Sequence, residues 1–143
     1  MKNILAVALL VSSFLFASCE KEEMNANQVA FTATLSGSEE VPAFNTMASG
    51  TLNGTFNTET KILAFTVTYT GMTPVAWHLH KAAKGSNGPV VFDLGTSFTS
   101  PYMWQTTALT AEQEADLMAG MYYLNIHSAL SPSGEIRGQL MKK

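Results

Sequence analysis

Apolar and polar residues alternate along most of the chain after residue 28, and this period of two constrains the fold more than any other feature. Segments 29–35 and 63–69 show it most clearly, because their apolar side chains fall on every second position. This is the pattern of a half-buried β-strand. Further strands are predicted over 75–80, 90–94, 121–127 and 136–140. Strands so closely spaced leave no room for repeated crossover helices, so we expect an antiparallel sandwich or barrel.

Turn-forming residues separate the predicted strands. Clusters of Gly, Pro, Asn and Ser stand at 37–38, 53–54, 71–74, 85–89 and 131–134. One short helix is predicted over 111–119, because Thr110 and Gln113 have the spacing of a capping box and Gly120 can supply the left-handed residue that ends a helix. We therefore expect an all-β domain over residues 29–143 with one connecting helix.

The first 28 residues have a different composition. Lys2 precedes an apolar run over 4–16, which is shorter than the roughly 20 residues that span a bilayer as a helix. Residues 1–18 are therefore predicted to be a signal peptide. The run ends in Leu-Phe-Ala-Ser-Cys at 15–19, which resembles the lipobox of bacterial lipoproteins. This resemblance implies cleavage before Cys19 and acylation of its thiol, with 19–28 as a polar tether.

Acylation of Cys19 would fix the location of the protein. Two or three acyl chains hold a protein on a membrane far more firmly than one chain does. We therefore expect an extracytoplasmic protein whose partner is a membrane, through the lipid anchor. The acidic segment 20–23 resembles the tag that carries some Gram-negative lipoproteins to the outer face of the outer membrane. We therefore expect attachment to the outer membrane, either on its outer face, exposed at the cell surface, or on its inner face.

Composition argues against several classes of function. The formal net charge is −3 and only 13% of residues are charged, so the chain lacks the basic surface that nucleic acids require. A single cysteine excludes an internal disulfide and zinc sites of the CxxC type. The sequence holds no GxSxG motif, and its 3 histidines are too few for the two-metal centre of a copper/zinc dismutase. We therefore expect no catalytic activity.

Several segments together resemble a known family. They are FTATLSGSEEVP (31–42), ASGTLNG (48–54), HLH (78–80), GSNGPVV (85–91), YLNIH (123–127) and GEIRGQL (134–140). They are similar to the CHRD domain, which is named after chordin and is widespread in secreted bacterial proteins. The resemblance implies an immunoglobulin-like or superoxide-dismutase-like β-barrel without established catalytic activity, and it makes Glu40 a candidate structural residue.

The three histidines are the candidate site residues. His78 and His80 are two apart on a predicted strand, so both point to the face opposite Val75, Trp77 and Leu79. His127 ends another predicted strand and would complete a cluster if the two strands lie together. Three imidazoles can bind zinc or copper and leave one position for water or a partner. The alternative is a hydrogen-bond network, whose possible partners are Glu135, Arg137 and Asp93.

Two functional hypotheses remain open from the sequence. The first is a non-catalytic, membrane-anchored extracytoplasmic module that binds an unidentified protein or small ligand. The second is a mononuclear zinc or copper protein that uses His78, His80 and His127. The imidazole separations in a structure, and the metal content of the purified protein, distinguish a metal site from a hydrogen-bond network.

Overall fold

The computed structural model describes residues 26–143, so the predicted signal peptide over 1–18 and Cys19 lie outside the described residues. Strands dominate the described part, with one α-helix and one short 3-10 helix. In chain order the elements are β1 (Gln28–Ser36), η1 (Gly37–Glu39), β2 (Ser49–Asn57), β3 (Ile62–Thr70), β4 (Pro74–Lys81), β5 (Val90–Asp93), β6 (Tyr102–Gln105), α1 (Ala111–Met118), β7 (Tyr122–Ser128), β8 (Ile136–Gln139) and β9 (Met141–Lys142).

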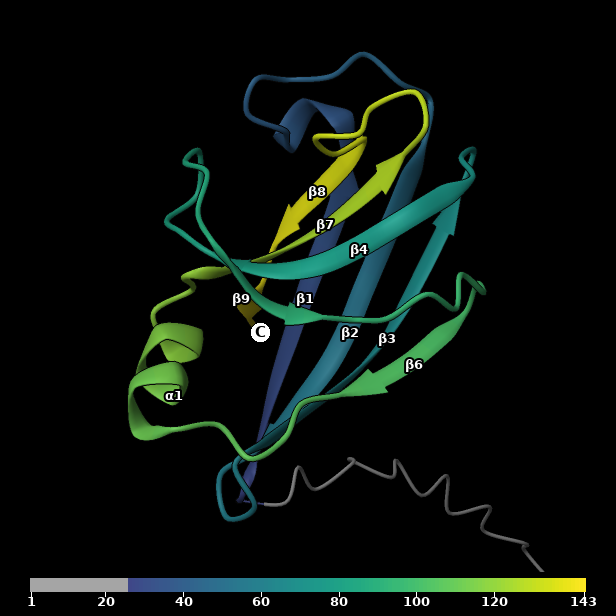
Figure 1. Ribbon diagram of the computed structural model, residues 1–143. Helices are drawn as coiled ribbons and strands as arrows, with labels where there is room; N and C mark the ends of the chain where they lie inside the picture. The colour runs from purple at the N-terminus through teal and green to yellow at the C-terminus, as the bar shows by residue number, and fades with distance from the viewer. Residues whose placement is uncertain (1–25) are drawn as a thin grey trace, which may run out of the picture.

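All strands belong to one antiparallel sheet in the order β5-β4-β7-β8-β1-β2-β3-β6, and β9 pairs with β1. The sheet curls, so the edge strands β5 and β6 come to lie near each other (Figure 1). Side chains join these edges, since the ring centroids of Phe92 and Trp104 are 6.0 Å apart and the Tyr102 hydroxyl donates to the Leu94 carbonyl at 3.0 Å. The curled antiparallel sheet with one short α-helix confirms the predicted all-β fold class.

The core lies on the concave side of the curled sheet, where every second side chain of the long strands is buried. Trp77 of β4 is the largest fully buried side chain. Its ring centroid lies 4.6 Å from that of Tyr102 and 5.5 Å from that of Phe98, so it packs against residues beside the far edge of the sheet. Because Trp77 and Leu79 point into this core, the residues between and after them on β4 must point outward.

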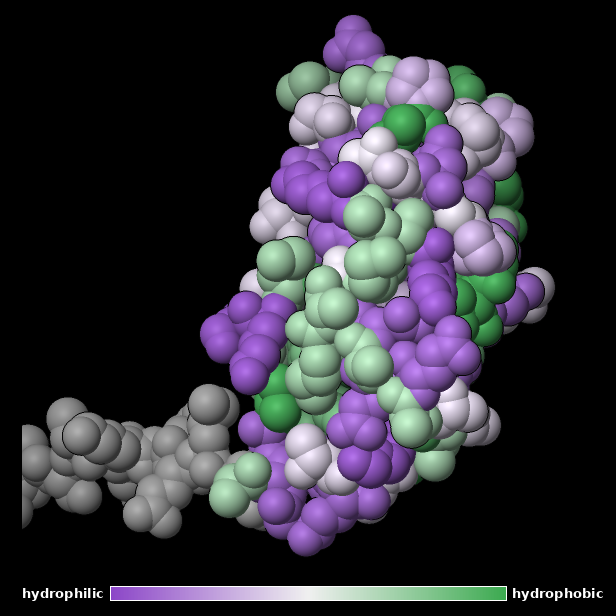
Figure 2. All heavy atoms as spheres, turned by 90° about the vertical axis from the view of Figure 1, so that its left-hand side faces the viewer, coloured by the Kyte–Doolittle hydropathy of each residue, from purple (hydrophilic) through white to green (hydrophobic). Residues whose placement is uncertain are grey.

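Helix α1 connects β6 to β7 and has the predicted capping box. Thr110 accepts a hydrogen bond from the Gln113 backbone at 3.2 Å, and the Gln113 side chain accepts one from the Thr110 backbone at 2.9 Å. Gly120 follows the helix with a φ of 68°. Leu117 is buried, whereas the surface on the α1 side of the molecule mixes hydrophilic and weakly hydrophobic side chains (Figure 2). The predicted helix is therefore confirmed, one residue shorter at its end.

Within residues 26–143, no helix combines the length and the hydrophobicity needed to cross a membrane.

The prediction of a turn at Asn53-Gly54 is wrong, because both residues lie in the middle of β2, a strand that was not predicted. Gly54 faces the interior, where a Cβ would lie only 2.8 Å from the Phe65 Cβ, so this glycine allows two strands to approach closely. The turn of this hairpin follows Asn57 instead, whose side-chain oxygen accepts from the Glu59 and Thr60 backbones at 2.9 Å each.

The predicted inward face of β4 is wrong at one position. Val75 is 52% exposed, whereas Pro74 is buried. The pairing of β4 with β7 shifts register between Pro74 and Ala76, so the alternation of the strand is interrupted there and resumes before Trp77.

Candidate metal centre

Strands β4 and β7 place the three histidines on the outer face of the sheet. The two strands pair antiparallel, with His80 opposite Tyr123, His78 opposite Asn125 and Ala76 opposite His127. His127 is therefore one side-chain row beyond His78 on the neighbouring strand, a diagonal relation that long or aromatic side chains can bridge. All three imidazoles are half-buried.

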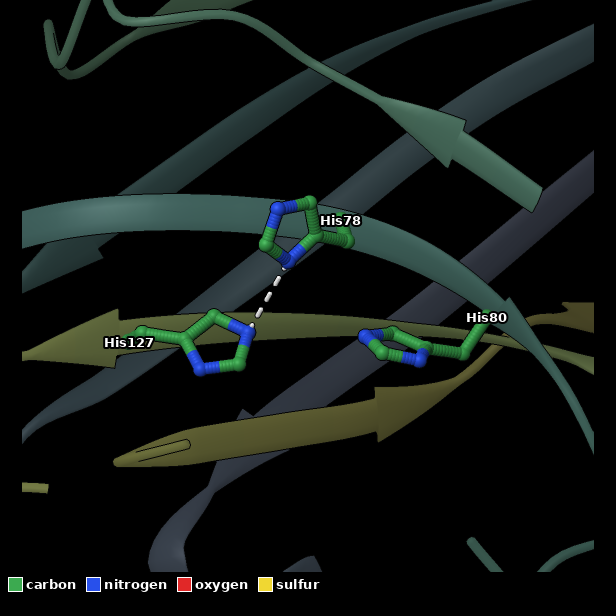
Figure 3. A group of neighbouring side chains, drawn as sticks. All are labelled: His78, His80 and His127. Atoms are coloured by element: carbon green, nitrogen blue, oxygen red, sulfur yellow. Dashed lines mark hydrogen bonds between the residues drawn. The ribbon is translucent and has the colours of Figure 1, made fainter. Parts of the chain in front are cut away.

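The structure brings the three imidazoles together (Figure 3). The Nδ1 atom of His78 lies 3.0 Å from the Nε2 atom of His127. One ring nitrogen from each histidine can be chosen so that all three atoms lie within 4.8 Å of one another. The ring of His80 points one nitrogen toward His127 (Figure 3). The residues that the sequence singled out as a possible cluster thus share one place on the surface.

Backbone carbonyls determine which nitrogens can act as ligands. The Nδ1 of His80 donates to the Gly88 carbonyl, and the Nδ1 of His127 donates to the Pro132 carbonyl, both at 3.0 Å. Because a carbonyl only accepts, each Nδ1 carries the proton and each Nε2 is left with a lone pair. The Nε2 of His80 is buried and has no hydrogen-bond partner among the described residues. It is an orphaned acceptor beside two other imidazoles.

The predicted hydrogen-bond partners of the histidines bond elsewhere. Glu135 accepts from the Thr46 hydroxyl at 2.7 Å, and Asp93 accepts from the Gly95 backbone at 2.7 Å. Arg137 donates to the loop after β4. None of these three possible partners bonds an imidazole within residues 26–143, where backbone carbonyls accept from the Nδ1 atoms of His80 and His127 instead.

Burial keeps two of the imidazoles neutral. Burial lowers the pKa of His80, and although its hydrogen bond to Gly88 opposes this shift, electrostatic interaction with the neighbouring His78 and Arg137 adds to it. Burial also lowers the pKa of His127, against its hydrogen bond to Pro132. A neutral imidazole is the form that binds a metal ion.

Tyr123 supports His80 from the neighbouring strand. The two rings stack with centroids 4.9 Å apart and an angle of 7°. The Arg137 guanidinium carbon lies 3.4 Å from the same Tyr123 ring centroid. Because β7 lies between β4 and β8, His80 and Arg137 cover opposite faces of this ring. The Tyr123 ring thus limits the movement of the imidazole and separates it from the buried cation.

The loop after β4 closes over this stack. The Gly88 backbone donates to the Tyr123 hydroxyl at 3.1 Å, and Arg137 donates to the Ser86 carbonyl at 2.7 Å and to the Asn87 side chain at 3.1 Å. A Cβ on Gly88 would overlap the Lys81 carbonyl oxygen, so only glycine fits here. The glycine-rich segment 85–89, identified from the sequence as a turn, thus positions the carbonyl that orients His80.

Two buried residues beside the cluster were not assigned to it from the sequence. Asn125 lies between His78 and Arg137 in the register of the sheet, and its amide donates to Glu40 at 3.2 Å. Burial raises the pKa of Glu40 to about 7, although the positive charge of Arg137 and the Asn125 hydrogen bond oppose the shift. Glu40 and Asn125 lie in the motif segments 31–42 and 123–127, which were identified from the sequence. Their contact could not be predicted, because it does not follow from the spacing of the two segments.

The three nitrogens fit an open tetrahedral site after a small adjustment. Two nitrogens at 2.0–2.1 Å from a tetrahedral zinc ion lie about 3.3 Å apart, against a largest separation of 4.8 Å among these imidazoles. Side-chain rotations of the half-buried rings can close this difference. The group contains no carboxylate and no cysteine, so a bound ion would keep one position for water or a partner.

The comparisons with known proteins give one match. The family model of the CHRD domain matches residues 31–140. This range includes the three histidines, the loop at 85–89 and Glu40. No curated protein and no solved structure matches the chain.

Proposed function

The chain belongs to the CHRD domain family, and from this membership we propose that it is a non-catalytic binding module outside the cytoplasm, with zinc or copper held by His78, His80 and His127. The family supports the non-catalytic part of the proposal. The metal-binding part of the proposal rests on the geometry of the three imidazoles. The expected membrane anchoring rests on Cys19 in the sequence.

One observation carries the metal proposal. Within residues 26–143, the His80 Nε2 is a buried lone pair without a hydrogen-bond partner, in a ring whose other nitrogen donates to a backbone carbonyl. A carbonyl or carboxylate that accepts from the outer nitrogen of a histidine is the usual support of a metal-bound imidazole. In a pure hydrogen-bond network the same buried nitrogen would be an unsatisfied acceptor, which costs about 1–3 kcal/mol. A metal ion removes that cost.

The ligand atoms suit both zinc and copper. His127 and His80 would bind through Nε2, and His78 through the Nδ1 that faces His127 in the metal-free form. Imidazole is a good ligand for both ions, and copper(II) binds more strongly to a given nitrogen site than zinc does. A bound ion with an open fourth position would allow the module to hold a small ligand or a side chain of another protein.

Metal content of the protein tests the proposal. The protein is purified without a histidine tag, stripped with a chelator, loaded with zinc or copper(II) and measured by elemental analysis. We expect one ion per chain for the wild type and a higher melting temperature, because metal binds only the folded state. His80→Ala should weaken binding at least about 100-fold, since it removes a direct ligand rather than an outer support.

A matched control separates loss of a ligand from disturbance of the loop. Ser86→Ala changes an exposed side chain of the covering loop and leaves the backbone that bonds Arg137, so it should bind metal like the wild type. Binding should weaken at acidic pH, because a ligating imidazole must be neutral. Burial lowers the pKa of His80 and His127, so these two take up protons only below the ordinary histidine value of about 6.5. A wild-type protein that holds no ion and melts at the same temperature with and without metal contradicts the proposal.

A further inference from the structure

A large part of the solvated surface of this protein carries no charge. Strands β1, β2, β3 and β6 lie side by side (Figure 1) and contain no Asp, Glu, Lys, Arg or His. Their outward positions are mostly hydroxyls and amides: Thr32, Thr34, Thr51, Asn53, Thr55, Thr66, Thr68 and Gln105. A soluble surface ordinarily consists of charged residues to about one quarter or more. This face therefore has fewer charged residues than an ordinary protein surface.

An open groove of about 930 Å³ crosses these four strands at right angles to their direction. Its floor is the backbone of the register-matched row Phe31, Gly54, Phe65 and Trp104. One wall has the side chains of Ala30, Thr55, Ala64 and Gln105, and the other has those of Asn53, Thr66 and Met103. Three strand spacings make the groove about 14 Å long. Its size suits an extended ligand rather than a compact one.

A second, smaller groove of about 420 Å³ repeats the arrangement on the same face. Its floor passes over Gly50 and Tyr69, and Thr51 and Thr68 stand on one wall, with their hydroxyls 2.8 Å apart. Gly50 precedes Gly54 by four residues on β2, so the two grooves are parallel and about 13 Å apart. Two hydroxyl-lined grooves thus follow one another along the sheet, and Lys143 is the one charged residue among those that line them.

The groups that line the grooves restrict the chemistry of the ligand. The floor residues pair with their neighbours in the sheet, so a peptide cannot add to this face through its own backbone as it does at a free strand edge. Lys143, whose ammonium donates to the Asn53 side-chain oxygen at 3.3 Å, is the one charged residue that lines the groove. A cationic ligand would lose water without gaining an opposite charge there, and an anionic ligand would gain only this one. Side-chain amides and hydroxyls beside small apolar residues suit a neutral chain rich in hydroxyl groups.

We propose that the outer face of β1, β2, β3 and β6 binds a neutral polysaccharide, whose chain lies across the strands in the groove over Gly54. Asn53 supplies amide donors, since its oxygen already accepts from Thr32 and Lys143, and Gln105 supplies an amide on the opposite wall. Met103, which is 80% exposed, supplies an apolar contact at the β6 end. This site is separate in the fold from the histidines, which lie on β4 and β7, and it does not depend on the proposed metal function.

Affinity electrophoresis and titration calorimetry with the full chain test the proposal. The probes are a soluble glucan, a mannan and a galactan, each neutral, with polygalacturonate and heparin as charged counterparts. We expect binding to at least one neutral polysaccharide, no binding to the charged ones, and no change after treatment with a chelator. The double variant Asn53→Ala/Gln105→Ala should weaken binding about tenfold, through the loss of two neutral hydrogen-bonding side chains.

Asn45→Ala is the matched control, because Asn45 is an exposed amide in the loop between η1 and β2, away from both grooves. It should bind the polysaccharide like the wild type. The proposal is overturned if the wild type binds none of the neutral polysaccharides, or if the double variant binds as tightly as Asn45→Ala. Loss of binding on chelation would place the ligand at the histidines and would also overturn it.

Discussion

At the scale of single residues, Glu40 is a carboxyl group held where its charge is unfavourable. It is 7% exposed and has one hydrogen bond, to Asn125, while its other oxygen and the Asn125 oxygen have no partner among the described residues. Its charge is only partly compensated by Arg137, so burial raises its pKa from 4.5 to about 7. The sequence marked Glu40 only through its family motif, because neither burial nor a partner 85 residues away can be derived from a local pattern.

Replacement of this carboxyl group should stabilise the protein in a pH-dependent way. The folded state takes up a proton on Glu40 below pH 7 and the unfolded state only below 4.5, so the wild type loses stability as the pH rises through this interval. Glu40→Gln cannot ionise, and its amide can donate to the free Asn125 oxygen. We expect it to be more stable than the wild type by up to about 3 kcal/mol at pH 8, with the difference nearly lost at pH 5.

Urea unfolding at the two pH values measures this difference. Glu39→Gln is the matched control, because Glu39 is half-buried and pairs with Lys84 at 3.0 Å near the surface. Loss of the Glu39–Lys84 ion pair in Glu39→Gln should change the free energy of unfolding by no more than about 1 kcal/mol. A Glu40→Gln protein that is less stable than the wild type at pH 8 would show that the ionised carboxylate stabilises the fold.

At the scale of elements, alternation predicted most of the strands but missed β2, β6 and β9. β1, β3, β4, β5, β7 and β8 follow from the sequence, and so does α1 from its capping box. β2 was missed because Gly50 and Gly54 occupy two of its inward positions, so only Leu52 and Phe56 mark its buried face. In the folded protein its register with β1 and β3 defines it as a strand, and that pairing is not a local property of the sequence.

The close approach at Gly54 gives an element-scale prediction. Valine is a better strand former than glycine, but a Cβ at this position would lie 2.8 Å from the Phe65 Cβ and 2.9 Å from the Ala64 oxygen. We expect Gly54→Val to lower the free energy of unfolding by about 1–3 kcal/mol through overpacking. Thr55→Val, on the outward side of the same strand, should change it by no more than about 0.5 kcal/mol. Thermal unfolding of both proteins checks this, and equal stability would mean that β2 can move away from β3.

At the scale of the whole molecule, three loops meet on one side of the sheet. The loop after η1, the segment 85–89 and the segment 131–135 all contact the outer face of β4, β7 and β8 through Glu40, Gly88 and Pro132. The sequence predicted that His78 and His80 share a face, since they are neighbours on one strand. Whether His127 joins them depends on the pairing of β4 with β7 across 49 residues. Only the assembled sheet determines that pairing.

We propose that Cys19, which lies outside the described residues, determines the location of the whole molecule. We expect the wild type in the membrane fraction, labelled by a fatty acid supplied to the cells, because several acyl chains anchor a protein firmly. Cys19→Ala should move the protein to the soluble fraction and abolish the label. Ser18→Ala is the matched control, since it keeps a small residue before the cysteine and should be labelled and anchored like the wild type. If Cys19→Ala stays in the membrane fraction while the wild type takes up no label, the anchor is not a lipid on Cys19, and the domain reaches the membrane through another part of the chain.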